Sequence, residues 1–192
     1  MYVPAQAGRI RQGDILRNLE YRDAYNTSVG TVTHNFSIVL TQDCDLLQDH
    51  KSRAAMQKTE AEEYELLKGD TPPNNDKFIT SVLVCPAFVA ENLKDGIHLA
   101  MINWKMQRIN SSLKGPVYRN DNPRYHYLEL DEGFGLPALI VDFKHTFSLP
   151  IEYLNKKSEN KIARLEEMYA QSLCHRHSYY VSRVPLPDEI DD

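Results

Sequence analysis

A short apolar run that ends in charged residues is the feature that most constrains how this chain can fold. Residues 36–46 read FSIVLTQDCDL, so a β-prone run is followed at once by a polar group, Gln42, Asp43, Cys44 and Asp45. A buried strand can hold two carboxylates only where they have partners, so we expect the strand to end here, at the rim of a sheet. The pattern predicts a rim motif in which one thiol lies between two carboxylates.

Length and composition indicate a soluble globular protein. The chain has 192 residues, of which 42% are hydrophobic and 26% are charged, which suits one hydrophobic core. We expect a single domain over residues 1–187 and an acidic tail over residues 188–192. No segment approaches the run of about 18 apolar residues that a bilayer crossing needs. With no apolar signal region at the N-terminus and three widely separated cysteines, we expect a cytoplasmic protein with no membrane association.

The order of apolar runs predicts the fold class. Strands are expected at residues 13–19, 36–41, 78–88, 125–130, 137–143 and 178–184, and residues 25–35 suit a hairpin loop or a mobile connection. Helices are expected on the surface near 51–69 and, from apolar residues at helical spacing, near 160–175. The chain is therefore predicted to be an α+β protein with a small, strongly bent sheet or SH3-like barrel and a C-terminal helix.

Charge is distributed unevenly in a chain whose formal net charge is −5. Residues 104–127 hold five Lys and Arg residues against one acid, Asp121, and aromatic residues are interleaved with them. Single-stranded nucleic acids are bound by such mixtures, since cations contact phosphates and aromatic rings stack on bases. The plainer alternative is that the aromatic rings pack beneath a solvated loop. The candidate nucleic-acid-binding residues are Trp104, Lys105, Arg108, Lys114, Arg119, Arg124 and Tyr125.

The thiol and carboxylates of the rim motif allow several kinds of chemistry. Carboxylates close to Cys44 would raise its pKa and oppose nucleophilic catalysis. Zinc would require distant segments to meet, with ligands drawn from Cys44, Cys85, Cys174 and His175 or His177. Asp43 and Asp45 would face one side of an extended chain and could hold another divalent ion, or they could cap backbone amides in a turn. The candidate rim site comprises His34, Thr41, Gln42, Asp43, Cys44 and Asp45, with catalytic and metal-binding residues left open.

Two strings near the N-terminus resemble the opening of PemK/MazF-type small barrels. Gly13-Asp14-Ile15-Leu16 is followed some twenty residues later by residues 38–43, IVLTQD, and the resemblance covers about the first quarter of the chain. The resemblance implies an SH3-like barrel and, in active members, metal-independent RNA cleavage by an Arg and a Ser or Thr near the loop before the second strand. Residues 25–35 contain no Arg or Lys and have His34 as their titratable candidate. We therefore expect the ribonuclease site to be absent, although Thr41 matches the family's strand-end hydroxyl.

A second resemblance extends over more of the chain. The Asp43-Cys44-Asp45 element, a strand that ends in Cys85-Pro86, and a C-terminal helix that leads to residues 183–187 are similar to a group of uncharacterised bacterial proteins. That group implies no particular activity. The leading expectation is a nucleic-acid-associated accessory protein of a bacterial toxin or phage-defence system, with RNA or DNA as partner. The alternatives are a non-catalytic module that docks a protein through segregated charged faces, and a metal-dependent hydrolase that uses the rim.

Overall fold

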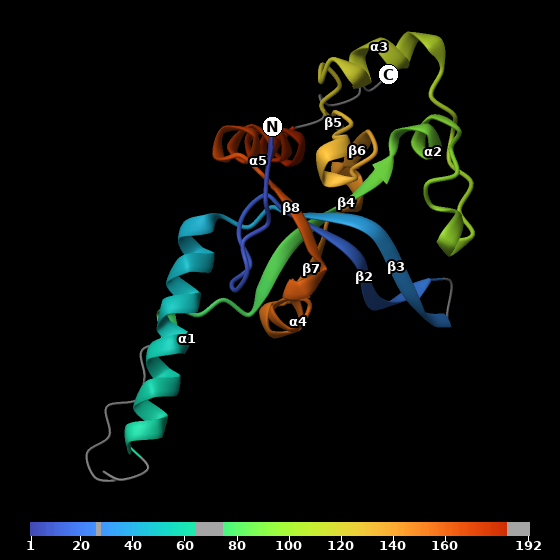
Figure 1. The fold of residues 1–192 in the computed structure, drawn as a ribbon. Helices are drawn as coiled ribbons and strands as arrows, with labels where there is room; N and C mark the ends of the chain where they lie inside the picture. The colour runs from blue at the N-terminus through green and yellow to red at the C-terminus, as the bar shows by residue number, and fades with distance from the viewer. Residues whose placement is uncertain (26–27, 64–74, 184–192) are drawn as a thin grey trace, which may run out of the picture.

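An open, strongly curled antiparallel sheet forms the centre of the α+β fold (Figure 1). The computed structural model describes residues 1–25, 28–63 and 75–183. The strand order is β1-β8-β2-β3-β4-β6-β5, and β7 pairs with β4 beside this path. The strands are β1 (Tyr2–Val3), β2 (Asp14–Tyr25), β3 (Ser28–Val39), β4 (Ser81–Val89), β5 (Tyr125–Leu128), β6 (Leu139–Asp142), β7 (Phe147–Pro150) and β8 (Lys161–Leu165).

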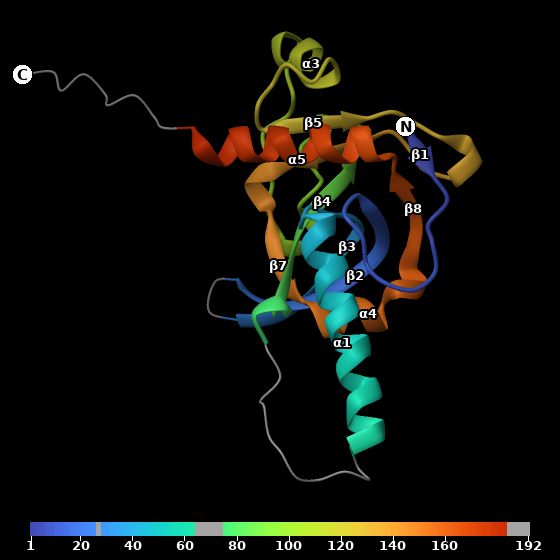
Figure 2. The ribbon, with the colours of Figure 1, turned by 90° about the vertical axis from the view of Figure 1, so that its left-hand side faces the viewer.

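Helices surround this half-barrel at different places. Figure 2 shows α5 crossing one end of the curled sheet, while α1 projects away from the body of the molecule. None of the helices in the described part of the chain combines the length and apolar character that a bilayer crossing needs. The helices are α1 (Asp43–Glu63), α2 (Ala90–Lys94), α3 (Ser111–Tyr118), α4 (Ile151–Lys156) and α5 (Glu167–Ser182).

Both faces of the sheet are buried, which explains why its central strands have continuous apolar runs. On β2 and β3, Ile15 and Ile38 belong to the core cluster beneath α5, whereas their neighbours Leu16 and Val39 belong to the cluster that meets α1 and α4. Consecutive strand residues point to opposite faces, so a strand covered on both sides has no polar alternation. A third cluster packs α2 and α3 against β4, β5 and β6. This is the end of the sheet that holds most of the predicted nucleic-acid-binding residues.

The surface helix begins earlier than predicted. It was expected near 51–69, but α1 begins at Asp43, and residues 64–69 lie outside the described part of the chain. Asp43 and Asp45 occupy its first turn, where the helix dipole favours carboxylates. The expected strand at 36–41 therefore ends at Val39, and the rim motif is a helix N-terminus rather than extended chain.

The C-terminal helix lies later than predicted. Residues 161–165, expected to be helical, form β8, in which Ala163 and Leu165 are buried and alternate with less buried neighbours. The apolar pattern of α5 instead runs through Ala170, Leu173 and Tyr180 on the inner side. The strand expected at 178–184 is therefore wrong over its helical part, which continues to Ser182. Residues 184–187 and the acidic tail at 188–192 lie outside the described residues.

A long hairpin replaces the connection expected at residues 25–35. Most of that segment belongs to β3, which pairs with β2 from Ile15↔Ile38 to Tyr25↔Ser28. Its alternating Val and Thr residues favour extended backbone, and this preference outweighs the loop character of the neighbouring Asn, Ser and Gly. The strands expected at 13–19, 78–88, 125–130 and 137–143 are confirmed as parts of β2, β4, β5 and β6.

Candidate functional site

The residues of the predicted rim site do not form one cluster. His34 lies in the middle of β3 and contacts Tyr21, whose hydroxyl is 3.3 Å from His34 Nε2. Thr41 has a structural role, since its Oγ1 accepts a hydrogen bond from the Leu83 N–H at 2.7 Å. Asp43 forms a two-pronged ion pair with Arg9, at 2.9 and 2.7 Å. His34 and the helix N-terminus are thus separate features.

The helical position of Asp43 and Asp45 disagrees with joint metal binding from an extended chain. Side chains two residues apart on a helix do not face each other. Partial burial acts to raise the pKa of Asp43, but the hydrogen bonds and charge of Arg9 outweigh it and hold the pKa below its usual value. The exposed Cys44 thiol lies 3.5 Å from both Gln42 Oε1 and Asp45 Oδ1, so it contacts its own helix turn.

A pocket of about 700 Å³ does bring the rim motif beside α5. Gln42, Asp43 and Cys44 line it together with Cys174 and His175. Burial raises the pKa of the Cys174 thiol to about 11, which favours its protonated form at pH 7. Cys85 lies elsewhere, fully buried, with its Sγ 3.3 Å from the Asp142 carbonyl oxygen. Within the described residues, no group of three His, Cys, Asp or Glu side chains is arranged to hold a metal ion.

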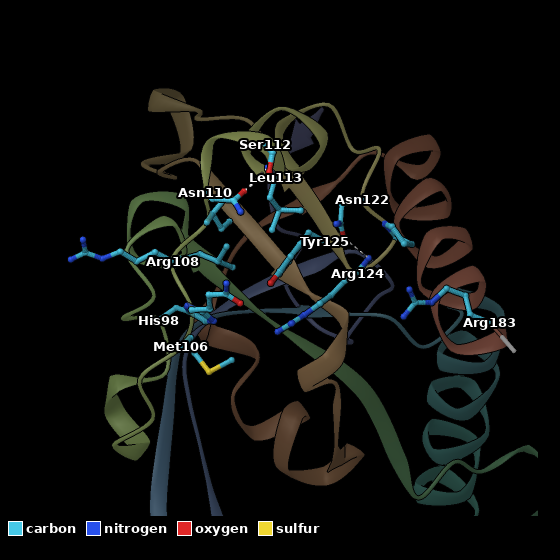
Figure 3. Close-up of a pocket in the computed structure, with 14 residues that line it drawn as sticks. His98, Met106, Arg108, Asn110, Ser112, Leu113, Asn122, Arg124, Tyr125 and Arg183 are labelled. Atoms are coloured by element: carbon cyan, nitrogen blue, oxygen red, sulfur yellow. Dashed lines mark hydrogen bonds between the residues drawn. The ribbon is translucent and has the colours of Figure 1, made fainter. Parts of the chain in front are cut away.

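A second pocket, of about 560 Å³, gathers three arginines and is called the arginine pocket below (Figure 3). Its described lining contains no Asp or Glu side chain and consists of Leu93, His98, Met106, Gln107, Arg108, Ile109, Asn110, Ser112, Leu113, Asn122, Pro123, Arg124, Tyr125 and Arg183. In Figure 3, the Arg108 side chain extends outward at one edge, while Arg183 reaches from the end of α5 toward the pocket at the other edge. The pocket is suited to an anion.

Backbone hydrogen bonds hold the walls of the arginine pocket. The Met106 and Ile109 N–H groups donate to the Gly96 and Lys94 carbonyls, each at 3.0 Å. Gly96 has φ +72°, a conformation that side chains with a Cβ rarely adopt, and an added Cβ would lie 2.3 Å from the Met106 oxygen. Asn110 caps α3, since its Oδ1 accepts from the Leu113 N–H at 2.9 Å.

A buried ion pair lies beneath the arginine pocket. Arg124 Nε and Nη2 donate to the two carboxylate oxygens of Asp142 at 2.8 and 2.6 Å, and Asp142 is fully buried. Asp142 also lies 3.6 Å from His145 Nε2. Since Asp142 neutralises Arg124, the excess positive charge of the pocket comes from Arg108 and Arg183.

Arg183 is the arginine of this pocket that was not predicted from the sequence as a binding residue. It follows α5 directly, and its guanidinium carbon lies 4.4 Å from the centre of the Tyr180 ring. Arg176, about two helical turns earlier, donates to the Asn122 and Tyr125 carbonyls at 2.8 and 2.9 Å and so ties α5 to the pocket wall. The helical spacing of Ala170, Leu173 and Tyr180 was the sequence signal that could have extended the predicted helix toward Arg183.

The predicted nucleic-acid-binding segment is divided by the fold. Arg108, Arg124 and Tyr125 line the arginine pocket, whereas Lys105, Lys114 and Arg119 are exposed outside its lining. Lys114 lies over the Tyr118 ring at 5.8 Å, and Arg119 pairs with the exposed Asp121 at 2.9 Å. Packing of aromatic residues also occurs, since the Tyr118 and Tyr127 rings lie 4.7 Å apart.

Trp104 belongs to a third pocket, of about 210 Å³, called the histidine pocket below. It is lined by Tyr21, His34, Leu99, Met101, Ile102, Trp104, Lys144, His145, Thr146 and Phe147. The Trp104 and His145 ring centres are 6.4 Å apart in an edge-on arrangement. Burial, together with the charge of His145, lowers the pKa of His34 to about 4, so its imidazole is neutral at pH 7.

The sequence was compared with protein-family models and with curated proteins. No protein-family model matches the chain. A search of curated proteins gives no significant match either. The described residues place exposed arginines at a pocket without acidic lining, which suits an anion, and an aromatic pocket beside it.

Proposed function

We propose that this protein binds single-stranded nucleic acid, with phosphate groups held at the arginine pocket. The observation that carries the proposal is the position of Arg108 and Arg183, from segments 75 residues apart, at opposite edges of one pocket whose described lining has no carboxylate. Arginine forms charge-assisted, two-pronged hydrogen bonds with phosphate oxygens. Phosphate contacts of this kind provide most of the affinity in sequence-independent binding.

The neighbouring histidine pocket favours a nucleic-acid strand, rather than a lone phosphate ion, as the proposed ligand. Asp142 contacts Arg124 of the arginine pocket and lies 3.6 Å from His145 of the histidine pocket, so one carboxylate separates the two. Trp104 is 41% exposed there, and an aromatic surface beside cations suits single strands whose bases are unstacked. The resemblance to PemK/MazF-type barrels adds the setting that we propose, an accessory protein of a toxin or phage-defence system without the MazF-type ribonuclease site.

Fluorescence anisotropy with a labelled single-stranded RNA, and with DNA of the same sequence, tests this proposal. We expect saturable binding at about 50 mM salt that weakens steeply by about 200 mM, because bound phosphates release counterions. For a single strand each phosphate contact adds about 0.7 to the slope of log affinity against log salt. The double variant Arg108→Ala, Arg183→Ala should therefore lower that slope by about 1.4.

Arg119→Ala is the matched control, because Arg119 is an exposed arginine of the same segment that lies outside the pocket lining. It should keep the affinity and the salt slope of the unmodified protein. No binding of either nucleic acid at about 50 mM salt would overturn the proposal. Equal behaviour of the double variant and the Arg119→Ala control would also overturn it, since binding would then occur elsewhere.

A further inference from the structure

The histidine pocket has the walls of a site for a flat heterocycle. His34 is nearly parallel to Phe147 and to Tyr21, with ring centres 5.3 and 5.7 Å apart and an interplanar angle of 27° in both pairs. Trp104 borders the same pocket and is 41% exposed. The volume of about 210 Å³ accommodates one heterocyclic base but not a whole nucleotide. Bases pulled out of a stack are held by such aromatic walls.

His34 forms one wall of this pocket and has a buried ring nitrogen without a partner among the described residues. His34 is 4% exposed, and its Nδ1 has no hydrogen-bond partner in the described part of the chain. The Tyr21 hydroxyl, 3.3 Å from Nε2, occupies the other ring nitrogen and fixes the imidazole. A buried nitrogen left without a hydrogen bond costs about 1–3 kcal/mol. His34 therefore gives the pocket a fixed aromatic wall, and its buried Nδ1 is not open to a ligand in the pocket.

The position of the histidine pocket beside the arginine pocket indicates which kind of ligand it could bind. His98 lines the arginine pocket and the next residue, Leu99, lines the histidine pocket, so the two share a wall. Asp142 lies between them through its contacts with Arg124 and His145. A ligand with a phosphate in one pocket can thus place an adjoining group in the other. In a nucleic acid strand, that group is a base.

We propose that the histidine pocket receives one unstacked nucleobase of the bound strand, with Trp104 as its stacking surface. This inference rests on the proposed nucleic-acid binding and adds base recognition to it. Stacking on an aromatic side chain contributes about 1–3 kcal/mol per base, and 1.4 kcal/mol corresponds to a tenfold change in affinity. The base site should therefore increase the affinity for a strand about tenfold or more.

Trp104 is the chain's only tryptophan, so its fluorescence reports on this pocket directly. The test compares a single-stranded oligonucleotide with an abasic oligonucleotide of the same length, which keeps the phosphates and lacks the bases. We expect the base-containing strand to bind about tenfold more tightly and to quench Trp104, and the abasic strand to bind without quenching. Equal affinity for both strands, with no change in fluorescence, would overturn the base site and leave phosphate binding intact.

Two variants separate the contributions of the pocket. Trp104→Leu, at a partly exposed position, should remove the preference for the base-containing strand and keep the affinity for the abasic strand. Trp104→Phe keeps an aromatic ring at the same position, so it should retain most of that preference. A Trp104→Leu protein that still prefers the base-containing strand would refute the assignment. Failure of both strands to bind would instead refute the proposed function as well.

Discussion

Buried histidines predict a loss of stability in mild acid. His34, His98 and His126 are 4%, 4% and 6% exposed, and burial lowers the pKa of each from 6.5 to about 4. Between these two values the unfolded chain binds a proton that the native protein does not bind. The stabilisation is therefore fully present above pH 6.5 and is lost as the pH falls toward 4.

The magnitude follows from those values. At pH 5 each histidine favours unfolding by about 2 kcal/mol, so the three together remove about 6 kcal/mol. Asp14 acts in the opposite direction, because burial raises its pKa to about 6 and acidification relieves a buried charge. It returns about 1 kcal/mol at pH 5, which leaves a net loss of about 5 kcal/mol. Proteins of this kind have a total stability of about 5–15 kcal/mol, so the loss should be large enough to measure readily.

His126→Gln tests this reasoning outside the proposed binding pockets. Urea denaturation of the protein and the variant at pH 7.5 and pH 5 gives the loss of unfolding free energy on acidification for each. We expect that loss to be about 2 kcal/mol smaller in the variant, whatever the substitution costs at pH 7.5. His50→Gln is the control, since His50 is exposed in α1. An equal acid loss in His126→Gln and the unmodified protein would refute the explanation.

Further substitutions test contacts that hold the fold. Gly13→Ala should cost about 3 kcal/mol in urea denaturation, because Gly13 has φ +79° and an added Cβ would lie 2.8 Å from Ala170 Cβ; an unchanged midpoint would contradict that approach of α5. Asp142→Asn should cost about 3 kcal/mol by leaving Arg124 without its buried partner, whereas Asp121→Asn, in an exposed pair, should cost less than about 1 kcal/mol. Asn110→Ala should lower stability by about 1 kcal/mol through loss of the α3 cap, as thermal unfolding would show.

The positions of the central strands were predictable, because strands that are covered on both faces of the sheet have continuous runs of apolar residues. Ile15, Leu16, Ile38 and Val39 indicate such strands because both faces of the sheet are covered. The start of α1 carried a usable signal in its first-turn carboxylates, which the rim interpretation assigned to extended chain. β8 was harder, since Ile162 and Leu165 also fit a helical spacing and only pairing with β2 decides between the two structures.

The candidate site was predictable in part. The basic and aromatic character of residues 104–127 pointed to Arg108, Arg124 and Trp104, but not to their division between two pockets. Arg183 reaches the arginine pocket because α5 continues to Ser182, beyond the end predicted near residue 175. His98 offered no local signal, because a single histidine in an apolar segment shows neither its burial nor its neighbours. These relations depend on contacts between segments far apart in the chain.

The pairing of β8 with β2 has a consequence for how the protein folds. Asp14 pairs with Arg164, and Tyr2 pairs with Leu165, so strands far apart in the chain lie side by side at the β1 edge of the sheet order. Such distant pairings form slowly, because a large chain entropy is lost before they contribute any stability. The β2–β3 hairpin will form early and must wait, with one edge and part of its apolar surface uncovered, until residues 161–165 have been synthesised. During that interval the nascent protein is expected to depend on chaperones more than its modest size suggests.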